Sequence, residues 1–153
     1  MKTTKQLAEG FAALNAKISK FLGDNEGVEG NASPDEERGE FVAYLLASSV
    51  CAHIAHLQTR AYTVHKALGA YYEAIPGLVD SVTEEWQGRN DTRITAYPKA
   101  VSIAMAEPKQ YFAELRDWVA EYRVNFGPDS EIQYRIDEIA SLIDETLYQL
   151  SLV

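Results

Sequence analysis

The sequence predicts an all-α protein: a four-helix bundle with a long crossover between its second and third helices, plus an additional amino-terminal helix. Three observations support this fold class. Apolar residues recur at the 3.6-residue spacing of a helix along most of the chain. No segment alternates convincingly between apolar and polar residues, as a half-buried strand would. With 153 residues, of which 46% are hydrophobic, the chain can bury a core without a metal or a disulfide.

The amino-terminal part is predicted to be separate from the bundle. Residues 1–24 contain the additional helix, and its apolar stripe consists of Leu7, Phe11, Leu14 and Ile18. The stretch that follows, GDNEGVEGNAS, is rich in glycine and acidic residues, so we interpret residues 25–33 as a linker. The four-helix bundle then occupies residues 34–153.

The first bundle helix begins at the stretch SPDE. Ser33 can cap the following amides, Pro34 suits the first helical position, and Glu36 completes a capping box. The apolar period then continues as far as Trp86, which would give one helix of over fifty residues and roughly 75 Å. That is too long for a compact domain of this size. We therefore predict that the chain turns back, with Thr59 as the N-cap of the second bundle helix.

The third and fourth bundle helices follow a mixed segment, RNDTRITAYPKAVSIAMAEP, which is predicted to cross from one end of the bundle to the other. Pro108 opens the third helix, and the stretch FGPDS ends it. Ser130 and Gln133 indicate a second capping box. The last helix has the clearest apolar stripe, formed by Ile132, Ile136, Ile139, Ile143, Leu147 and Leu150.

Composition limits the partners of the protein. A net charge of −9, without a Lys/Arg-rich tail at either end, predicts no general affinity for nucleic acid. No apolar run approaches the ~20 residues that span a bilayer, so we expect no membrane insertion. The start, MKTTKQLAEG, lacks the features of a secretory signal, and Cys51 is the single cysteine. These features favour the cytoplasm.

All three histidines of the chain lie in the stretch HIAHLQTRAYTVH, residues 53–65. Imidazole together with carboxylate is a ligand mixture suited to iron, manganese or zinc. The following helix supplies Glu73, Asp80 and Glu84, and its 100° periodicity places these three opposite the apolar stripe. His65 falls at the edge between the two faces. The pattern therefore predicts a metal site on the outer side of this helix.

A single chain cannot complete this site. His65 and Asp80 on one helix lie roughly 22 Å apart, whereas metal bonds to nitrogen or oxygen are about 2 Å long. Two copies of the helix packed antiparallel about a two-fold axis would instead place His65 of one chain beside Asp80 and Glu84 of the other. We therefore predict a homo-oligomer with its two-fold interface on the helix that carries His65 and Glu84.

These residues resemble the Dps-like miniferritins of the ferritin-like superfamily. In that family the ferroxidase centre lies between two-fold-related subunits and follows the pattern H-x(11)-H-x(14)-D-x(3)-E, which His53, His65, Asp80 and Glu84 match without a gap. The stretch AYP, residues 96–98, resembles a Tyr-Pro pair in the family's crossover. The stretch HLQTRAYTVHKALGAYYE is similar to uncharacterised ferritin-like proteins of tailed bacteriophages. Because the usual His-Trp is replaced by His53-Ile54, the first ligand is either His53 or His56.

The resemblance implies that the protein binds Fe(II) between subunits, oxidises it with peroxide or oxygen, and stores iron if the subunits close into a shell. Glu73 or Glu85 would add a ligand or guide ions. Glu-x-x-His pairs, which form the site inside one subunit of other diiron bundles, are absent from the sequence. The competing interpretation is an acidic, non-enzymatic phage protein that uses the same scaffold without metal and occupies a basic surface of a host protein.

Overall fold

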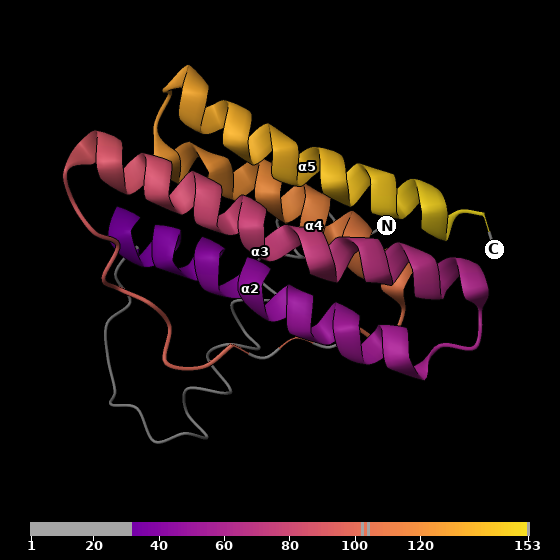
Figure 1. Cartoon of the computed structure of the whole chain (residues 1–153). Coiled ribbons are helices and arrows are strands. Elements are labelled where there is room, and N and C mark those ends of the chain that lie inside the picture. Colours follow the sequence, from indigo (N-terminus) through magenta and orange to yellow (C-terminus); the bar gives the residue numbers. More distant parts are fainter. Residues whose placement is uncertain (1–31, 102, 104, 153) are drawn as a thin grey trace.

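In the described part of the chain, residues 32–101, 103 and 105–152 of a computed structural model, helices are the regular secondary structure and there is no strand. Its long helices are α2 (Pro34–Gln58), α3 (Tyr62–Asn90), α4 (Pro108–Tyr122) and α5 (Ser130–Leu150), and the short 3-10 helix η1 (Arg123–Phe126) follows α4 (Figure 1). The predicted all-α class and its four long helices are confirmed for these residues. The predicted amino-terminal helix and nearly all of the linker lie outside them.

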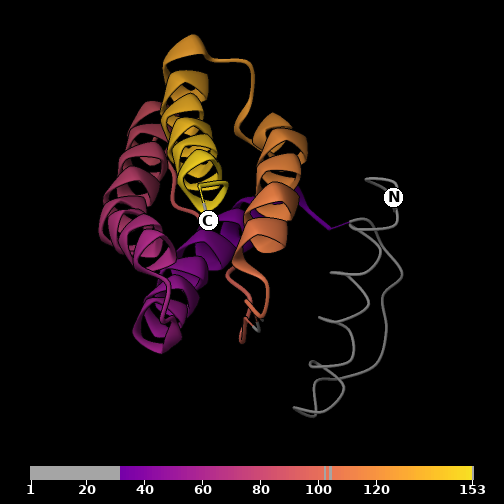
Figure 2. The same cartoon turned by 90° about the vertical axis from the view of Figure 1, so that its right-hand side faces the viewer.

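The four helices form two antiparallel pairs, α2 with α3 and α4 with α5. Arg38, near the start of α2, donates to the Asn125 carbonyl just after α4, while Arg89, at the end of α3, forms an ion pair with Asp129 at the start of α5. The segment between α3 and α4 therefore runs from this end of the bundle to the opposite one, as predicted (Figure 1). Figure 2 looks along the bundle and shows α5 between α3 and α4, with α2 crossing below.

The break between the first two helices lies where the sequence predicts it, but its capping differs. α2 ends at Gln58, and Thr59 is its C-cap, with its N–H donating to the Ala55 carbonyl. The N-cap of α3 is Ala61, which offers no side-chain acceptor; its own N–H donates to the Thr59 hydroxyl at 3.2 Å. The prediction of Thr59 as an N-cap is therefore wrong, because its hydroxyl stabilises the turn instead.

Two capping boxes were predicted, and one is present. The Ser33 N–H donates to the Glu36 carboxylate at 2.7 Å, and the Ser33 hydroxyl accepts from the Glu36 N–H at 3.3 Å. At α5 the N-cap is Asp129, whose carboxylate accepts from the Glu131 N–H, so the predicted box at Ser130 is wrong. Gln133 is not available for it, because its amide donates to the Gly127 carbonyl at 2.7 Å.

The core follows the predicted apolar stripes closely. On α3, the predicted residues Leu68, Tyr71, Ile75, Val82 and Trp86 are buried, and Leu78 is half-buried. On α5, all four isoleucines of the stripe are fully buried. Leu46 lies on the outer side of α2, where 38% of its surface is exposed. The polar faces of α3 and α5 consequently point away from the core.

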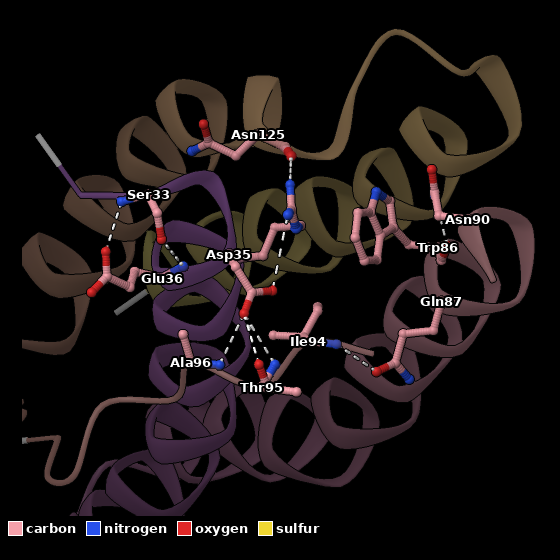
Figure 3. A network of polar contacts seen from close by, with 11 residues as sticks. Ser33, Asp35, Glu36, Trp86, Gln87, Asn90, Ile94, Thr95, Ala96 and Asn125 are labelled. Atoms are coloured by element: carbon pink, nitrogen blue, oxygen red, sulfur yellow. Dashed lines mark hydrogen bonds and ion pairs between the residues drawn. The ribbon is translucent and has the colours of Figure 1, made fainter. Parts of the chain in front are cut away.

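The crossover is held against the first turns of α2. The Asp35 carboxylate accepts hydrogen bonds from the N–H groups of Thr95 and Ala96, at 3.2 and 3.1 Å, and from the Thr95 hydroxyl (Figure 3). These bonds lower the pKa of Asp35, although partial burial alone would raise it. One turn further on, Gly39 is buried against the carbonyl of Ala96, and a Cβ atom there would overlap it. The absence of a side chain at residue 39 therefore lets the two backbones meet.

Arg38 ties this end of the bundle together. Its guanidinium lies 4.1 Å from the centroid of the Trp86 ring on α3 and donates to the Asn125 carbonyl at 2.8 Å. The Asp35 carboxylate lies 3.9 Å from the guanidinium and supplies a counter-charge, while the stacking on Trp86 adds a cation–π contact.

The sequence predicts no membrane-spanning segment, and the helix α2 bears on that prediction. Among the described residues it is the one helix long and apolar enough, by length and composition, to cross a membrane, and 33% of the residues in its most apolar window are buried. Core helices of other proteins meet the same criterion. Here α2 supplies Phe41, Leu45 and Ala52 to the core, each fully buried.

Candidate metal site

The three histidines lie together where α2 turns back into α3. His53 and His56 are on the last turns of α2, and His65 is on the first turn of α3. The short turn between the helices brings His56 and His65 face to face, with ring centroids 3.7 Å apart and ring planes inclined by 22°. The clustering seen in the sequence is therefore also a cluster in space.

Each ring of this pair is held by the backbone of the other residue. The Nδ1 atom of His56 lies 2.7 Å from the carbonyl oxygen of His65, and the Nδ1 atom of His65 lies 3.1 Å from the carbonyl oxygen of His56. Because a carbonyl oxygen can only accept, both Nδ1 atoms carry the proton. In the neutral rings Nε2 is then the unprotonated nitrogen. A metal-binding histidine is commonly oriented in this way, with one nitrogen donating to a carbonyl and the other facing the ion.

His53 lies on the other side of His56. Its ring stacks on Tyr72 of α3 with centroids 4.0 Å apart, and its centroid is 6.0 Å from that of His56. Its side chain is exposed, whereas His56 and His65 are half-buried. The nearer neighbour of His65 is thus His56, which the sequence left as one of two alternatives.

A pocket of about 470 Å³ opens beside the pair, between the start of α3 and the end of α5. Its lining includes His56, His65, Lys66, Glu73 and Gln149. Gly69 also borders it, and a Cβ atom at that position would lie 3.4 Å from two atoms of the His56 ring. The imidazole pair is therefore accessible to small solutes.

The predicted carboxylates lie farther along α3, on its outer side. Glu73, Asp80 and Glu84 are exposed, as the periodicity predicted. Within the described residues, neither Asp80 nor Glu84 takes part in an ion pair. Glu85, by contrast, forms a partly exposed ion pair with Arg135 of α5 at 2.7 Å, which engages its carboxylate.

One chain does not bring the predicted ligands together. Asp80 follows His65 by fifteen residues on the same helix, which is roughly 22 Å along its axis. In the part of the chain that the structure describes, no three His, Cys, Asp or Glu side chains are grouped so that they could hold one metal ion. The two imidazoles are therefore the part of the predicted site that a single chain assembles.

Two neighbours of the histidines were not singled out as functional from the sequence. Tyr72 stacks on His53, and its carbonyl accepts from the Ser49 hydroxyl at 3.0 Å, which joins α2 to α3 beside the site. Lys66 adds a cation to the pocket. Tyr72 follows His65 by seven residues, which places both on the same side of α3, and this spacing could have indicated from the sequence that Tyr72 lies near the histidines.

The single cysteine is a packing residue. Cys51 is half-buried, its Sγ lies 3.6 Å from the Ile103 carbonyl oxygen, and burial raises the pKa of its thiol. A protonated, partly buried thiol is a poor nucleophile and a poor metal ligand.

Fold and site together define a class: a helical bundle with a histidine cluster at the tip of its first helical hairpin and exposed carboxylates on the second helix of that hairpin. The chain belongs to the family described as "Family of unknown function (DUF5856)", whose model matches residues 56–150. That range includes His56, His65, Asp80 and Glu84, whereas His53 precedes it.

The chain is also similar to a protein of Enterobacteria phage T4, the "Uncharacterized 14.6 kDa protein in mobD-ri intergenic region". The two are 26% identical over 113 residues, which cover 74% of this chain and 87% of the phage protein. No solved structure matches this chain. The relation to a bacteriophage protein agrees with the phage proteins that the sequence resembles.

Proposed function

We propose that this protein is a Dps-like member of the ferritin-like superfamily that binds Fe(II) between two subunits and oxidises it. The observation that carries the proposal is the His56–His65 pair, because both rings are oriented through Nδ1 and keep Nε2 for a ligand. His53, which fits the family spacing, lies within one ring contact of the pair and would be a further ligand.

The helical architecture supports this proposal. Two antiparallel helix pairs joined by a crossover along the bundle resemble the ferritin-like arrangement. In the miniferritins that the sequence resembles, the ferroxidase centre lies between two-fold-related subunits. The corresponding surface here would be the outer side of α3, which carries His65 and the exposed carboxylates.

A two-fold axis near the middle of α3 would complete the site. If two copies of α3 pack antiparallel with the axis close to Glu73, His65 of one subunit faces residues 80–84 of the other, because the two positions are equally far from that axis. Asp80 and Glu84 of the partner subunit would then supply the oxygen ligands. The two copies of Glu73 would meet near the axis, where they could bind or guide cations.

Iron is the substrate in this proposal. Each of two Fe(II) ions would lose one electron, and one molecule of hydrogen peroxide would accept both electrons together with two protons to give two molecules of water. Dioxygen is the alternative acceptor. The imidazoles and carboxylates would hold the ions at a fixed place, and they would also accept manganese or zinc. Storage of the oxidised iron would require that the subunits close into a shell.

Anaerobic titration of Fe(II) into the purified full chain, followed by addition of peroxide, tests the proposal. We expect at most two ions bound per subunit interface and a ferric absorbance that grows faster than in buffer. His65→Ala and His56→Ala should abolish most of this, whereas the matched surface variant Glu145→Gln on α5 should not. Absence of Fe(II) binding by the unaltered chain would reject the proposal and favour the acidic interaction protein.

A further inference from the structure

An apolar stripe runs along the outer side of α2. It consists of Leu46, Val50, Ile54 and Leu57, and their exposed fractions are 38%, 61%, 50% and 72%. Their spacings of four, four and three residues place them on one side of the helix. Single exposed apolar residues are common on protein surfaces, but an apolar row of this length marks a contact surface. We refer to these four residues as the α2 stripe.

The sequence offers an occupant of matching shape. Residues 3–22 carry the apolar stripe Leu7, Phe11, Leu14 and Ile18, with spacings of four, three and four. This stripe spans eleven residues, as the α2 stripe does, so both are about 16 Å long when helical. A helix of this length is only marginally stable alone and depends on an apolar surface to pack against.

We propose that residues 3–22 pack as a helix along the α2 stripe of the same chain, antiparallel to α2. In this arrangement Ile18 lies near Leu46, and Leu7 lies near Leu57. In this orientation the segment runs towards the start of α2, so the linker has to cover only a short distance to Ser33. The segment thus forms a further helical hairpin with α2 and covers the apolar surface that the four-helix bundle leaves exposed.

The connecting chain is long enough for this packing. Eleven residues lead from Leu22, the end of the proposed helix, to Ser33, and an extended chain of that length reaches about 37 Å. Leu46 follows Ser33 by thirteen residues along α2, which is about 20 Å. The glycines of the linker, such as Gly27 and Gly30, add no bulky side chain to the turn.

Charge complementarity also favours this occupant. Residues 1–22 contain four Lys and one Glu, a net charge of +3, whereas residues 34–153 contain ten Lys and Arg against nineteen Asp and Glu, a net charge of −9. The exposed carboxylates of α3, among them Asp80 and Glu84, belong to the same helix pair as the α2 stripe. The cationic segment is attracted to this acidic surface.

Disulfide trapping in the full chain tests the proposal. In a Cys51→Ser background, Leu14→Cys is combined with Val50→Cys, and the matched control combines Ala12→Cys with Val50→Cys. Ala12 is two residues from Leu14 but on the opposite side of the predicted helix. On mild oxidation we expect the Leu14 pair to form an intramolecular disulfide about tenfold faster than the Ala12 pair. Equal rates, or disulfides between chains in place of intramolecular ones, would overturn the proposal.

A second readout does not depend on disulfide geometry. In the Cys51→Ser background with Val50→Cys alone, the rate of thiol alkylation reports how well residue 50 is covered. Phe11→Asp should raise this rate severalfold, because an unpaired charge at the contact releases the segment, whereas Ala12→Asp should leave it unchanged. An unchanged rate for Phe11→Asp would reject the packing. The proposal does not rest on metal binding, so neither result depends on the outcome of the Fe(II) titration.

Discussion

His56 and His65 orient each other across the turn between α2 and α3. Each imidazole donates its Nδ1 proton to the other residue's backbone carbonyl, at 2.7 and 3.1 Å, and the two rings stack. The pair therefore has a structural effect that does not require metal, because it joins the end of one helix to the start of the next. It also restricts the rings to one orientation, which lowers the entropic cost of binding an ion at Nε2.

The first prediction concerns stability without metal. His65→Ala removes one ring, its hydrogen bond to the His56 carbonyl and the stacking contact, so we expect the free energy of unfolding to fall by about 1 kcal/mol. Urea denaturation followed by circular dichroism, with a chelator present, measures this. His53→Ala removes an exposed ring and should cost less, within about 0.5 kcal/mol. Equal losses for the two variants would show that the His56–His65 pair has no structural role.

The second prediction concerns the close approach of α2 and the crossover. Gly39→Ala places a Cβ atom on the Ala96 carbonyl, and because the obstacle is backbone, the crossover must move. We expect a loss of about 1–3 kcal/mol, the usual cost of overpacking. Gly77→Ala on α3 is the matched control: a Cβ there meets nothing within 4 Å, so the helix should gain up to about 1 kcal/mol. Thermal unfolding of both variants should shift in opposite directions.

Some of this structure could be predicted from the sequence, and the reason is local. The stripe on α3 and the capping box at Ser33 depend on residues within a few turns of each other, and both are confirmed. Helix length predicted that a break must occur, and Thr59 was used to place it after Gln58, where it is found. The role of Thr59 was wrong, because a hydroxyl can serve either flank of a short turn. Gly39 was not predicted to matter, since its contact comes from residue 96.

In the candidate site, too, the features set by nearby residues could be predicted and those set by contacts between helices could not. The exposure of Asp80 and Glu84 followed from the helical period, which is a local property. The pairing of His56 with His65 did not, because it depends on how tightly the chain turns between α2 and α3. A spacing pattern alone favoured His53, and the geometry of the turn is what brings His56 closer to His65. The contact between two chains follows neither from a local sequence pattern nor from the geometry of one chain, so the shared metal site remains a prediction.

The third prediction is a pH dependence at Asp35. Hydrogen bonds from the crossover lower the pKa of this carboxyl in the folded chain below its ordinary value near 3.9. A group with a depressed folded pKa stabilises the protein above its unfolded pKa, and that contribution is lost as the pH falls through the folded pKa. Asp35→Asn should therefore lower stability at neutral pH, by on the order of 1 kcal/mol after solvent screening, and this difference should shrink as the pH falls through the folded pKa of Asp35.

Urea denaturation between pH 2.5 and 7 would measure this difference. The control is Asp80→Asn, which removes the same charge from an exposed position on α3 that has no hydrogen bond among the described residues. If the stability of Asp35→Asn runs parallel to that of the unaltered chain across this range, the crossover is not held by the ionised carboxylate.

The fourth prediction tests whether the metal site is shared between subunits. His65→Ala and Glu84→Ala should each lose Fe(II) oxidation, for opposite reasons: the first lacks the imidazole and the second lacks the carboxylate. When the two variants are unfolded together and refolded as a 1:1 mixture, half of the two-fold interfaces should combine one of each. Every such interface contains one site with both defects and one site with none, so about one quarter of the original activity should return.

The mixed sample distinguishes the shared site from every arrangement within one chain. If His65 and Glu84 served the same subunit, each variant would carry its own defect into the mixture, and no activity would return. A matched mixture of His65→Ala with His56→Ala gives the complementary control, because both side chains come from the same side of the proposed interface. That mixture should stay inactive, since each mixed interface contains two damaged sites. Recovery in the first mixture alone therefore requires that imidazole and carboxylate come from different chains.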